Sequence, residues 1–286
     1  MAMSKLHPNA PMPTPPAPER GDGELCSLLS EPLAQALRQA PEGAAALRRQ
    51  LLGRLAASRA AEACMFTARW RRLPRQPLAA GITAQVLYRA QAGAVLRPGE
   101  PLYVRLIELA PGASLMPNVC GTANLHREWL VLTGSVMLGP QTLSQRDYHV
   151  TPVGYPSPAI ASPEGGVLFL RESALAAEPG EAPFTVRDGE AGWPDFAPGI
   201  KRRVLWQRGG QAALLYYAQP GAQVPQHVHG HDEECLMVQG ELFLDDLLLQ
   251  AGDYQLAPAG SGHHTTHTDT GVVIYAHGDL DLQFTG

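Results

Sequence analysis

From residue 64 onward the chain is built of short apolar runs separated by Gly, Pro and Asp. Runs of about four to eight residues rich in β-branched and aromatic side chains, bounded by turn residues, predict strands. Many such strands at regular spacing are typical of a β-sandwich or β-barrel. We therefore expect a mainly β protein whose strands include AQVLYR, YVRLIELA, EWLVLTG, VLFLR, RVLWQR, ALLYYA, CLMVQGELFL and VVIYAHG.

The strand pattern occurs twice. The segment FTAR at 66–69 returns as FTVR at 184–187, an offset of 118 residues, whereas Gly134 and Gly240 are 106 residues apart. The offset shrinks along the chain, so the first copy has the longer loops. Self-similarity of this kind indicates two copies of one β-domain. We expect two tandem double-stranded β-barrels of the jelly-roll type, spanning 64–180 and 181–286.

The N-terminal part has a different composition. Residues 1–26 are rich in Pro and Gly, and we expect them to be disordered. In 27–63, Leu47, Leu51 and Leu55 recur every fourth residue, which predicts short amphipathic helices. These helices either pack on the protein's own sheets, which we favour, or bind another protein.

Composition and charge exclude several classes of function. Of the 286 residues 45% are hydrophobic, enough for a sizeable core, and the formal net charge is −5. This charge does not favour binding to nucleic acid or to an anionic membrane surface. No apolar run reaches the roughly 18–20 residues of a membrane span, and the start lacks an apolar signal segment, so we expect a cytoplasmic protein. The four cysteines form no CxxC pair and should be free thiols.

The stretch GAQVPQHVHGHDEECLMVQG at 221–240 is dense in metal-binding side chains. Alternate residues of a strand share a face, so His227 and His229 should point the same way. Glu233 should enter the next strand, and the downstream GDYQLAPAGSGHHTTH should bring His263 beside the first two imidazoles. Three imidazoles and one carboxylate suit Zn, Fe(II), Mn, Ni or Cu. The sequence thus predicts a divalent metal site.

Other polar residues lie close to these four. His231 should be solvated in the turn, and Glu234 and His264 should point away from the metal. Cys235 shares the inward face of Glu233; it is either a small buried apolar residue or a redox-active thiol. His267 also lies on the inward face, where it either orients a ligand or bound water or sits at the rim.

Two spacings match known motifs. The pattern Gly-x5-His-x-His-x3-Glu-x6-Gly at 221–240 matches the first cupin motif, and Gly-x5-Pro-x-Gly-x2-His at 252–263 matches the second up to its final Asn, where this chain has His267. With a helical N-terminal segment, the chain resembles the ChrR-type cupin anti-sigma factors over about residues 30–286, most strongly at 182–278. The resemblance implies a cupin fold and a bound metal, with zinc the expected ion. It makes the metal ligands His227, His229, Glu233 and His263.

The first copy lacks this ligand set. Aligned on the shared glycines and prolines, its four ligand positions hold Asn118, Cys120, Arg127 and Ser157, and His126 falls out of register. This domain should be structural or ligand-binding rather than metal-binding.

Three functions remain. The resemblance implies a metal-binding regulator or stress sensor acting in transcription regulation, with a sigma factor as partner. In that family the sigma-binding domain often carries a His followed by CxxC, whereas His7 and Cys26 are isolated here. The second function is a metal-dependent dioxygenase or related enzyme acting on a small molecule. The third is a storage or scaffold cupin with a structural metal. No acid–base pair or substrate-binding Arg is evident near His227, which favours the regulator, and a homodimer is expected by analogy.

Overall fold

The computed structural model describes residues 48–50, 52–53, 64–117, 119 and 124–285. The chain divides into two compact units, Met1–Ala56 and Ala57–Gly286, and the second holds all the strands described below. The predicted disordered tail and most of the predicted helical segment lie outside the described residues, but 48–50 and 52–53 are helical. Across the described part of the chain, no helix has the length and apolar character needed to cross a bilayer.

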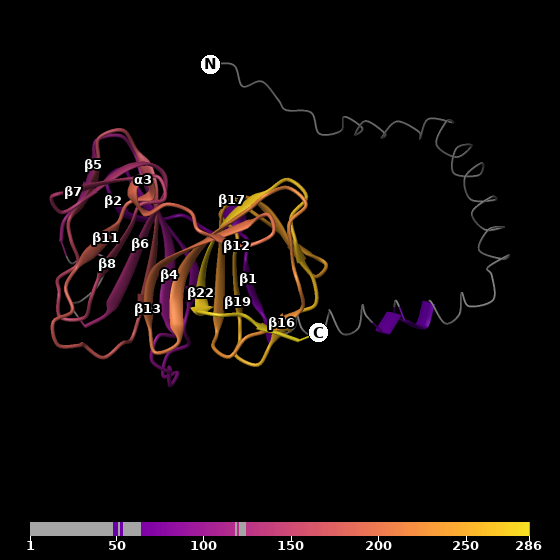
Figure 1. Ribbon diagram of the computed structural model, residues 1–286. Helices are drawn as coiled ribbons and strands as arrows, with labels where there is room; N and C mark the ends of the chain where they lie inside the picture. Colours follow the sequence, from indigo (N-terminus) through magenta and orange to yellow (C-terminus); the bar gives the residue numbers. More distant parts are fainter. Residues whose placement is uncertain (1–47, 51, 54–63, 118, 120–123, 286) are drawn as a thin grey trace, which may run out of the picture. The chain divides into compact units, whose positions relative to one another are not determined.

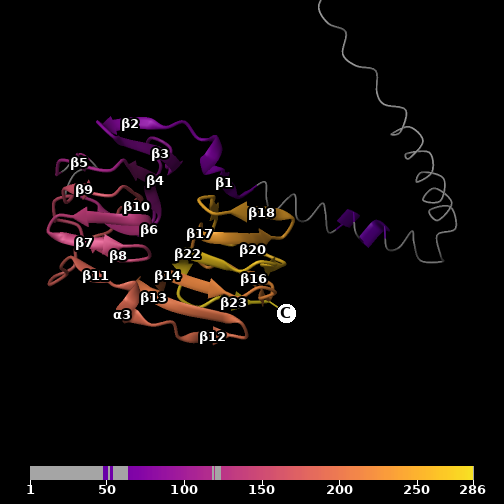
Figure 2. The same cartoon turned by 90° about the horizontal axis from the view of Figure 1, so that it is seen from above.

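The unit Ala57–Gly286 is mainly β and contains two barrels (Figures 1 and 2). We call the purple-to-magenta one the first barrel. Its sheet has ten strands, and its main path runs β11-β8-β6-β10-β4-β3-β2. The strands are β2 (Gln76–Ala79), β3 (Ile82–Arg89), β4 (Pro101–Leu109), β5 (Ala113–Leu115), β6 (His126–Leu138), β7 (Gln141–Ser144), β8 (Tyr148–Thr151), β9 (Ile160–Ser162), β10 (Gly166–Ser173) and β11 (Phe184–Val186).

The second barrel, orange to yellow, repeats this plan. Its main path runs β1-β19-β17-β22-β14-β13-β12, and a small sheet β20-β16-β23 accompanies it. The 3-10 turn η1 (Trp70–Arg72) and the helix α3 (Asp188–Ala191) are short. The strands are β1 (Phe66–Ala68), β12 (Asp195–Ala197), β13 (Ile200–Arg208), β14 (Gln211–Ala218), β15 (Gln223–Val224), β16 (His227–Val228), β17 (Glu233–Leu244), β18 (Leu247–Gln250), β19 (Tyr254–Ala257), β20 (Gly262–His263), β21 (Thr266–His267), β22 (Val272–Asp279) and β23 (Gln283–Phe284).

Matching glycines fix the same bend in both copies. Gly134 in β6 and Gly240 in β17 have φ of 74° and 78°. A Cβ atom would lie 2.3 Å from the Gly165 carbonyl oxygen in the first case and 2.1 Å from that of Gly271 in the second. Only glycine combines this backbone conformation with so close an approach. The expectation of two tandem barrels is confirmed.

Two strands belong to the barrel on the other side of the expected domain boundary between residues 180 and 181. Strand β1 pairs with β19 of the second barrel, and β11 pairs with β8 of the first. In Figure 1 the indigo β1 accordingly lies among the strands of the second barrel. The residues that follow these strands occupy matching positions, since Arg69 binds the carboxylate of Asp253 and Arg187 that of Asp147. Each copy therefore lends one edge strand to the other, which ties the barrels together. The domain limits themselves stay predictions.

Three apolar clusters form the core. One fills the first barrel and includes Trp129, and another fills the second and includes Met237. The third lies between the barrels and takes residues such as Phe169 and Tyr275 from both. Strand alternation explains the division, because neighbouring residues of one strand face a barrel interior and the space between the barrels in turn.

A buried charged network runs through the cluster between the barrels. Arg171 of β10 donates to Glu128 of the first barrel at 2.8 Å and to Glu234 of the second at 2.8 Å. The Tyr275 hydroxyl donates to Glu128 at 2.7 Å and that of Tyr254 to Glu234 at 2.8 Å. All five side chains are nearly inaccessible to solvent, so the carboxylates depend on these donors for compensation.

Candidate metal site

The site residues come from strands β16, β17 and β20 of the second barrel and from His229, which directly follows β16. Strand β16 carries His227 and pairs with β20, so that His227 lies directly opposite His263. A Cβ atom on Gly262 would lie 2.3 Å from the His227 carbonyl oxygen, so the glycine permits this close pairing. After the turn that follows His229, Glu233 opens β17. Folding thus brings together two segments some thirty residues apart in the chain.

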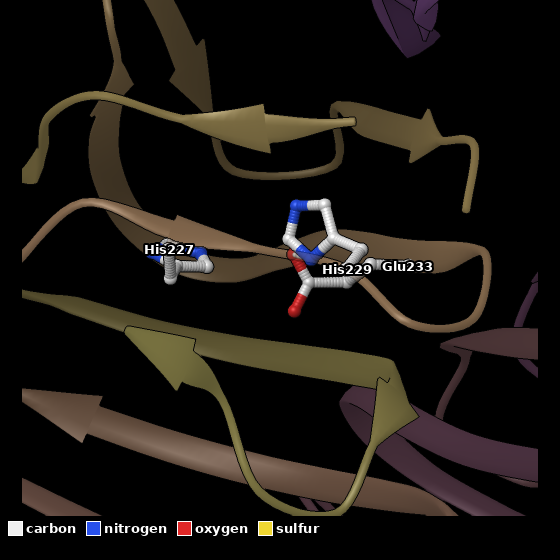
Figure 3. A group of neighbouring side chains, drawn as sticks. All are labelled: His227, His229 and Glu233. Atoms are coloured by element: carbon white, nitrogen blue, oxygen red, sulfur yellow. Dashed lines mark ion pairs between the residues drawn. The ribbon is translucent and has the colours of Figure 1, made fainter. Parts of the chain in front are cut away.

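The four side chains gather closely (Figure 3 shows three of them). Ligand atoms of His227, His229 and Glu233 all lie within 4.8 Å of one another. The ring of His263 has its centroid 5.6 Å from that of His227 and 5.2 Å from that of His229. The expected meeting of three imidazoles and one carboxylate is therefore present in the fold, while the role of each as a metal ligand stays a prediction.

Two of the imidazoles have a neighbour at Nδ1 outside the cluster, whereas Nδ1 of His229 lies 3.3 Å from Oε2 of Glu233, itself a candidate ligand. Nδ1 of His227 lies 3.0 Å from the Pro225 carbonyl oxygen, and Nδ1 of His263 lies 3.9 Å from Asp245. Nε2 of His229 and Nε2 of His263 are buried and make no hydrogen bond within the described residues. Buried polar atoms normally have a partner, so these nitrogens are suited to a bound cation. Contacts that hold one ring nitrogen and leave the other for a metal are the usual arrangement at such sites.

Burial affects the protonation of His227, His229 and Glu233. Desolvation lowers the pKa of His227, and it lowers that of His229 to about 4. Desolvation also raises the pKa of Glu233 above its ordinary value, although His263 and His227 oppose this. Imidazoles that stay neutral at pH 7 are in the form that binds a metal. A divalent cation fits this donor set, because it would also stabilise the carboxylate in the buried site.

A small cavity adjoins the cluster inside the barrel. Its volume is about 60 Å³, which is enough to hold water. The walls are mostly apolar, and His227, Glu233 and His263 line it together with Tyr216 and His267. Burial, followed by the nearby carboxylate of Glu233, raises the pKa of the Tyr216 hydroxyl, which therefore remains a proton donor. The ring of His267 stacks on Phe243 with centroids 4.8 Å apart.

The neighbouring candidates occupy distinct surroundings. Cys235 is buried in the apolar cluster of the second barrel, and desolvation together with Glu233 and Glu234 raises the pKa of its thiol well above the ordinary value. Glu234 faces the space between the barrels, as alternation along β17 requires. His231 lies beside Asp279, and His264 is half-exposed. A role for Cys235 or His267 beside the metal stays a prediction.

Three groups at the site were not predicted from the sequence. Asp245 stands behind His263 but comes from the turn between β17 and β18, where it also accepts hydrogen bonds from the backbone of His264 and Thr265. Tyr216 is one of two adjacent tyrosines in β14, and strand alternation alone does not say which faces inward. The Pro225 oxygen is a backbone atom, which no residue pattern reveals.

The first barrel lacks the cluster at the described positions. Arg127, in register with Glu233, is buried and pairs with Glu172 at 3.0 Å. Ser157, in register with His263, is buried as well. Residues 118 and 120, expected at the two remaining positions, lie outside the described residues.

The second barrel matches a known family. Residues 181–281 match the ChrR Cupin-like domain. No curated protein matches the sequence. The match agrees with the expected resemblance to the ChrR type, and it covers the barrel that holds the four candidate ligands.

Solved structures show the same fold. A candidate dioxygenase from Nostoc punctiforme superposes with a TM-score of 0.61 at 14% identity, over 78% of this chain and 87% of that one. YlbA from E. coli gives 0.59 at 14% identity over 76% and 93%. The oxalate decarboxylase of Lactobacillus farciminis, in its formate complex, gives 0.55 at 14% identity over 76% and 87%. At such low identity the likeness establishes the cupin fold alone.

Proposed function

We propose that the second barrel binds one divalent transition metal through His227, His229, Glu233 and His263, and that zinc is the resident ion. The observation that carries this proposal is the pair of buried imidazole nitrogens, on His229 and His263, that make no hydrogen bond within the described part of the chain. A cation would satisfy both and offset the carboxylate charge. Nitrogen and oxygen donors of this kind suit zinc, and iron, manganese and nickel fit the same set.

The biological role that we propose is that of a metal-binding regulator or stress sensor of ChrR type. The match of residues 181–281 to that family supports the role. A sigma factor is the partner that this role implies.

The test is to purify the tagged protein from its native host and to measure both its metal and its co-purifying proteins. Zinc near one equivalent with a bound sigma factor would support the regulator. The His263→Ala variant serves as the comparison, because it should lack the ion. If the partner's binding depends on the metal, the amount of sigma factor that co-purifies with this variant should differ from that of the wild type. Iron at one equivalent with no partner would contradict the regulatory role.

A second candidate is a metal-dependent dioxygenase, which the Tyr216 hydroxyl favours. This group lines the cavity beside Glu233 and His263 and stays protonated, so it could donate to an oxygen atom of a ligand there. A bound metal would supply activation of that oxygen. The iron-loaded protein should then consume O₂ with a small substrate, and Tyr216→Phe should slow this without changing the metal content.

A further inference from the structure

A short turn carries a candidate metal ligand at each of its ends. His229 follows β16 directly, Glu233 opens β17, and only Gly230, His231 and Asp232 lie between them. A shift of this turn would therefore displace an imidazole and a carboxylate together. Sites on loops are held less precisely than sites on strands unless neighbouring hydrogen bonds fix them. The contacts that the turn makes thus bear directly on the metal site.

Asp279, the last residue of β22, holds this turn at two points. Its Oδ2 atom accepts a hydrogen bond from the backbone N–H of Gly230 at 2.5 Å, and its Oδ1 atom lies 2.5 Å from Nδ1 of His231. The side chain of Asp279 is only 9% exposed. A Cβ atom on Gly230 would lie 3.2 Å from Oδ1, so the turn approaches the carboxylate closely. Hydrogen bonds to a carboxylate are stronger than those between neutral groups, and Asp279 therefore ties the turn firmly to β22.

The same turn is joined to the segment that precedes His263. Oδ1 of Asp232 accepts a hydrogen bond from the backbone N–H of Ala259 at 2.8 Å. The backbone N–H of His229 donates to the Ser261 carbonyl oxygen at 2.9 Å. These bonds connect the two ligand-bearing segments to each other, whereas the carboxylate at the end of β22 connects them to the main sheet of the second barrel.

We propose that Asp279 is a positioning residue for the metal site, which keeps His229 and Glu233 in place through its contacts with Gly230 and His231. Both of its oxygens are engaged by the turn, so it acts on the site through the turn and not as a ligand. The inference rests on the proposed metal site and is independent of the regulatory role. Replacing residues that orient metal ligands typically weakens metal binding about 10–100-fold.

The experiment measures the zinc affinity of the full-length protein by competition with a chromophoric chelator. Asp279→Ala should weaken zinc binding about 10–100-fold. Asp279→Asn should weaken it no more than about threefold, because its amide oxygen still accepts from Gly230 and its N–H donates to a neutral His231. Asp281→Ala is the matched control, since that carboxylate is exposed and lies 3.4 Å from Arg202; it should bind zinc like the wild type.

The visible spectrum of the cobalt-substituted protein gives a readout that a loss of stability alone would not change, because it reports the geometry of the ligands. The spectrum should change in Asp279→Ala and match the wild type in Asp279→Asn. Melting temperatures of the metal-free proteins are measured in parallel.

Wild-type zinc affinity and an unchanged cobalt spectrum in Asp279→Ala overturn the proposal even if the melting temperature falls, because Asp279 would then only stabilise the fold. A loss beyond about tenfold in Asp279→Asn overturns it too, because charge rather than position would be the cause. A wild-type chain that binds no zinc refutes the metal site itself, and this proposal with it.

Discussion

Replacing Arg171 with leucine tests the network that joins the two barrels. The guanidinium is fully buried and contacts two carboxylates, Glu128 at 2.8 Å through Nη1 and Glu234 at 2.6 Å through Nη2, as well as the carbonyl oxygen of Gly99. Burial raises the pKa of Glu128, but His277 and Arg171 beside it more than offset this effect and lower the pKa to about 2. Without the arginine, two carboxylates would remain in the interior, and among the described residues tyrosines and histidines would be their neighbours.

The expected magnitude follows from this geometry. Removing one partner of a buried ionic network costs about 3–5 kcal/mol of unfolding free energy. For a unit of this size, each kcal/mol lowers the melting temperature by about 2–4 °C, so Arg171→Leu should lower it by about 6–20 °C. Arg97→Leu is the control, because Arg97 is exposed and lies 3.7 Å from Glu100; it should change stability by no more than about 0.5 kcal/mol.

The assay is urea unfolding followed by intrinsic fluorescence, with calorimetry for the melting temperature. A triple variant with Arg171→Met, Glu128→Gln and Glu234→Gln removes all three charges and should recover at least half of the loss, because the cost arises from unpaired charge. A loss below about 1 kcal/mol in Arg171→Leu would refute this reasoning. A triple variant no better than the single one would refute it too, since packing would then be the cause.

Three further predictions concern pH, backbone and thiols. Burial, followed by Arg171, lowers the pKa of His277 from 6.5 to about 3, so between these pH values the unfolded chain binds a proton that the folded chain does not. The unfolding free energy should therefore fall as the pH drops from 6.5 toward 3, by up to about 1.4 kcal/mol per pH unit from this group. An unchanged slope of unfolding free energy against pH in His277→Gln would contradict this. Gly240→Ala meets the Gly271 carbonyl oxygen and should cost about 2 kcal/mol more in urea unfolding than Gly154→Ala, which has a similar φ and open space around it; equal losses would contradict the steric argument. Iodoacetamide should modify the exposed Cys64 well before Cys235, whose buried thiol has a raised pKa, and equal rates in peptide mass spectrometry would contradict its burial.

Much of the fold could be predicted from the sequence because its signals are local. Strand runs and turn residues recur in both copies. Gly134 and Gly240 each mark a backbone bend with positive φ and a close backbone neighbour, which only glycine can occupy. The gathering of His227, His229 and His263 was also predictable, since alternation gives the face of each residue and the motif spacing gives the pairing of the strands.

What could not be predicted depends on contacts between distant segments. Alternation says that Glu234 points away from the metal, but it does not say that Arg171, 63 positions earlier, meets it. The pairing of β1 with the second barrel and of β11 with the first also lies beyond the pattern, because two equivalent strands fit either sheet equally well by sequence. Asp245 reaches His263 from a turn, where no periodicity applies.

The most direct test of the metal site is the metal content of the purified protein, measured by elemental mass spectrometry. The wild-type chain should carry about one divalent ion, and His227→Ala and His263→Ala should lose it and melt at a lower temperature, because the ion binds only the folded ligand set. Ser157→Ala alters the corresponding position of the first barrel and should keep both the metal and the melting temperature. Full metal content in His263→Ala, or loss of metal in Ser157→Ala, would contradict the assignment of the site to the second barrel.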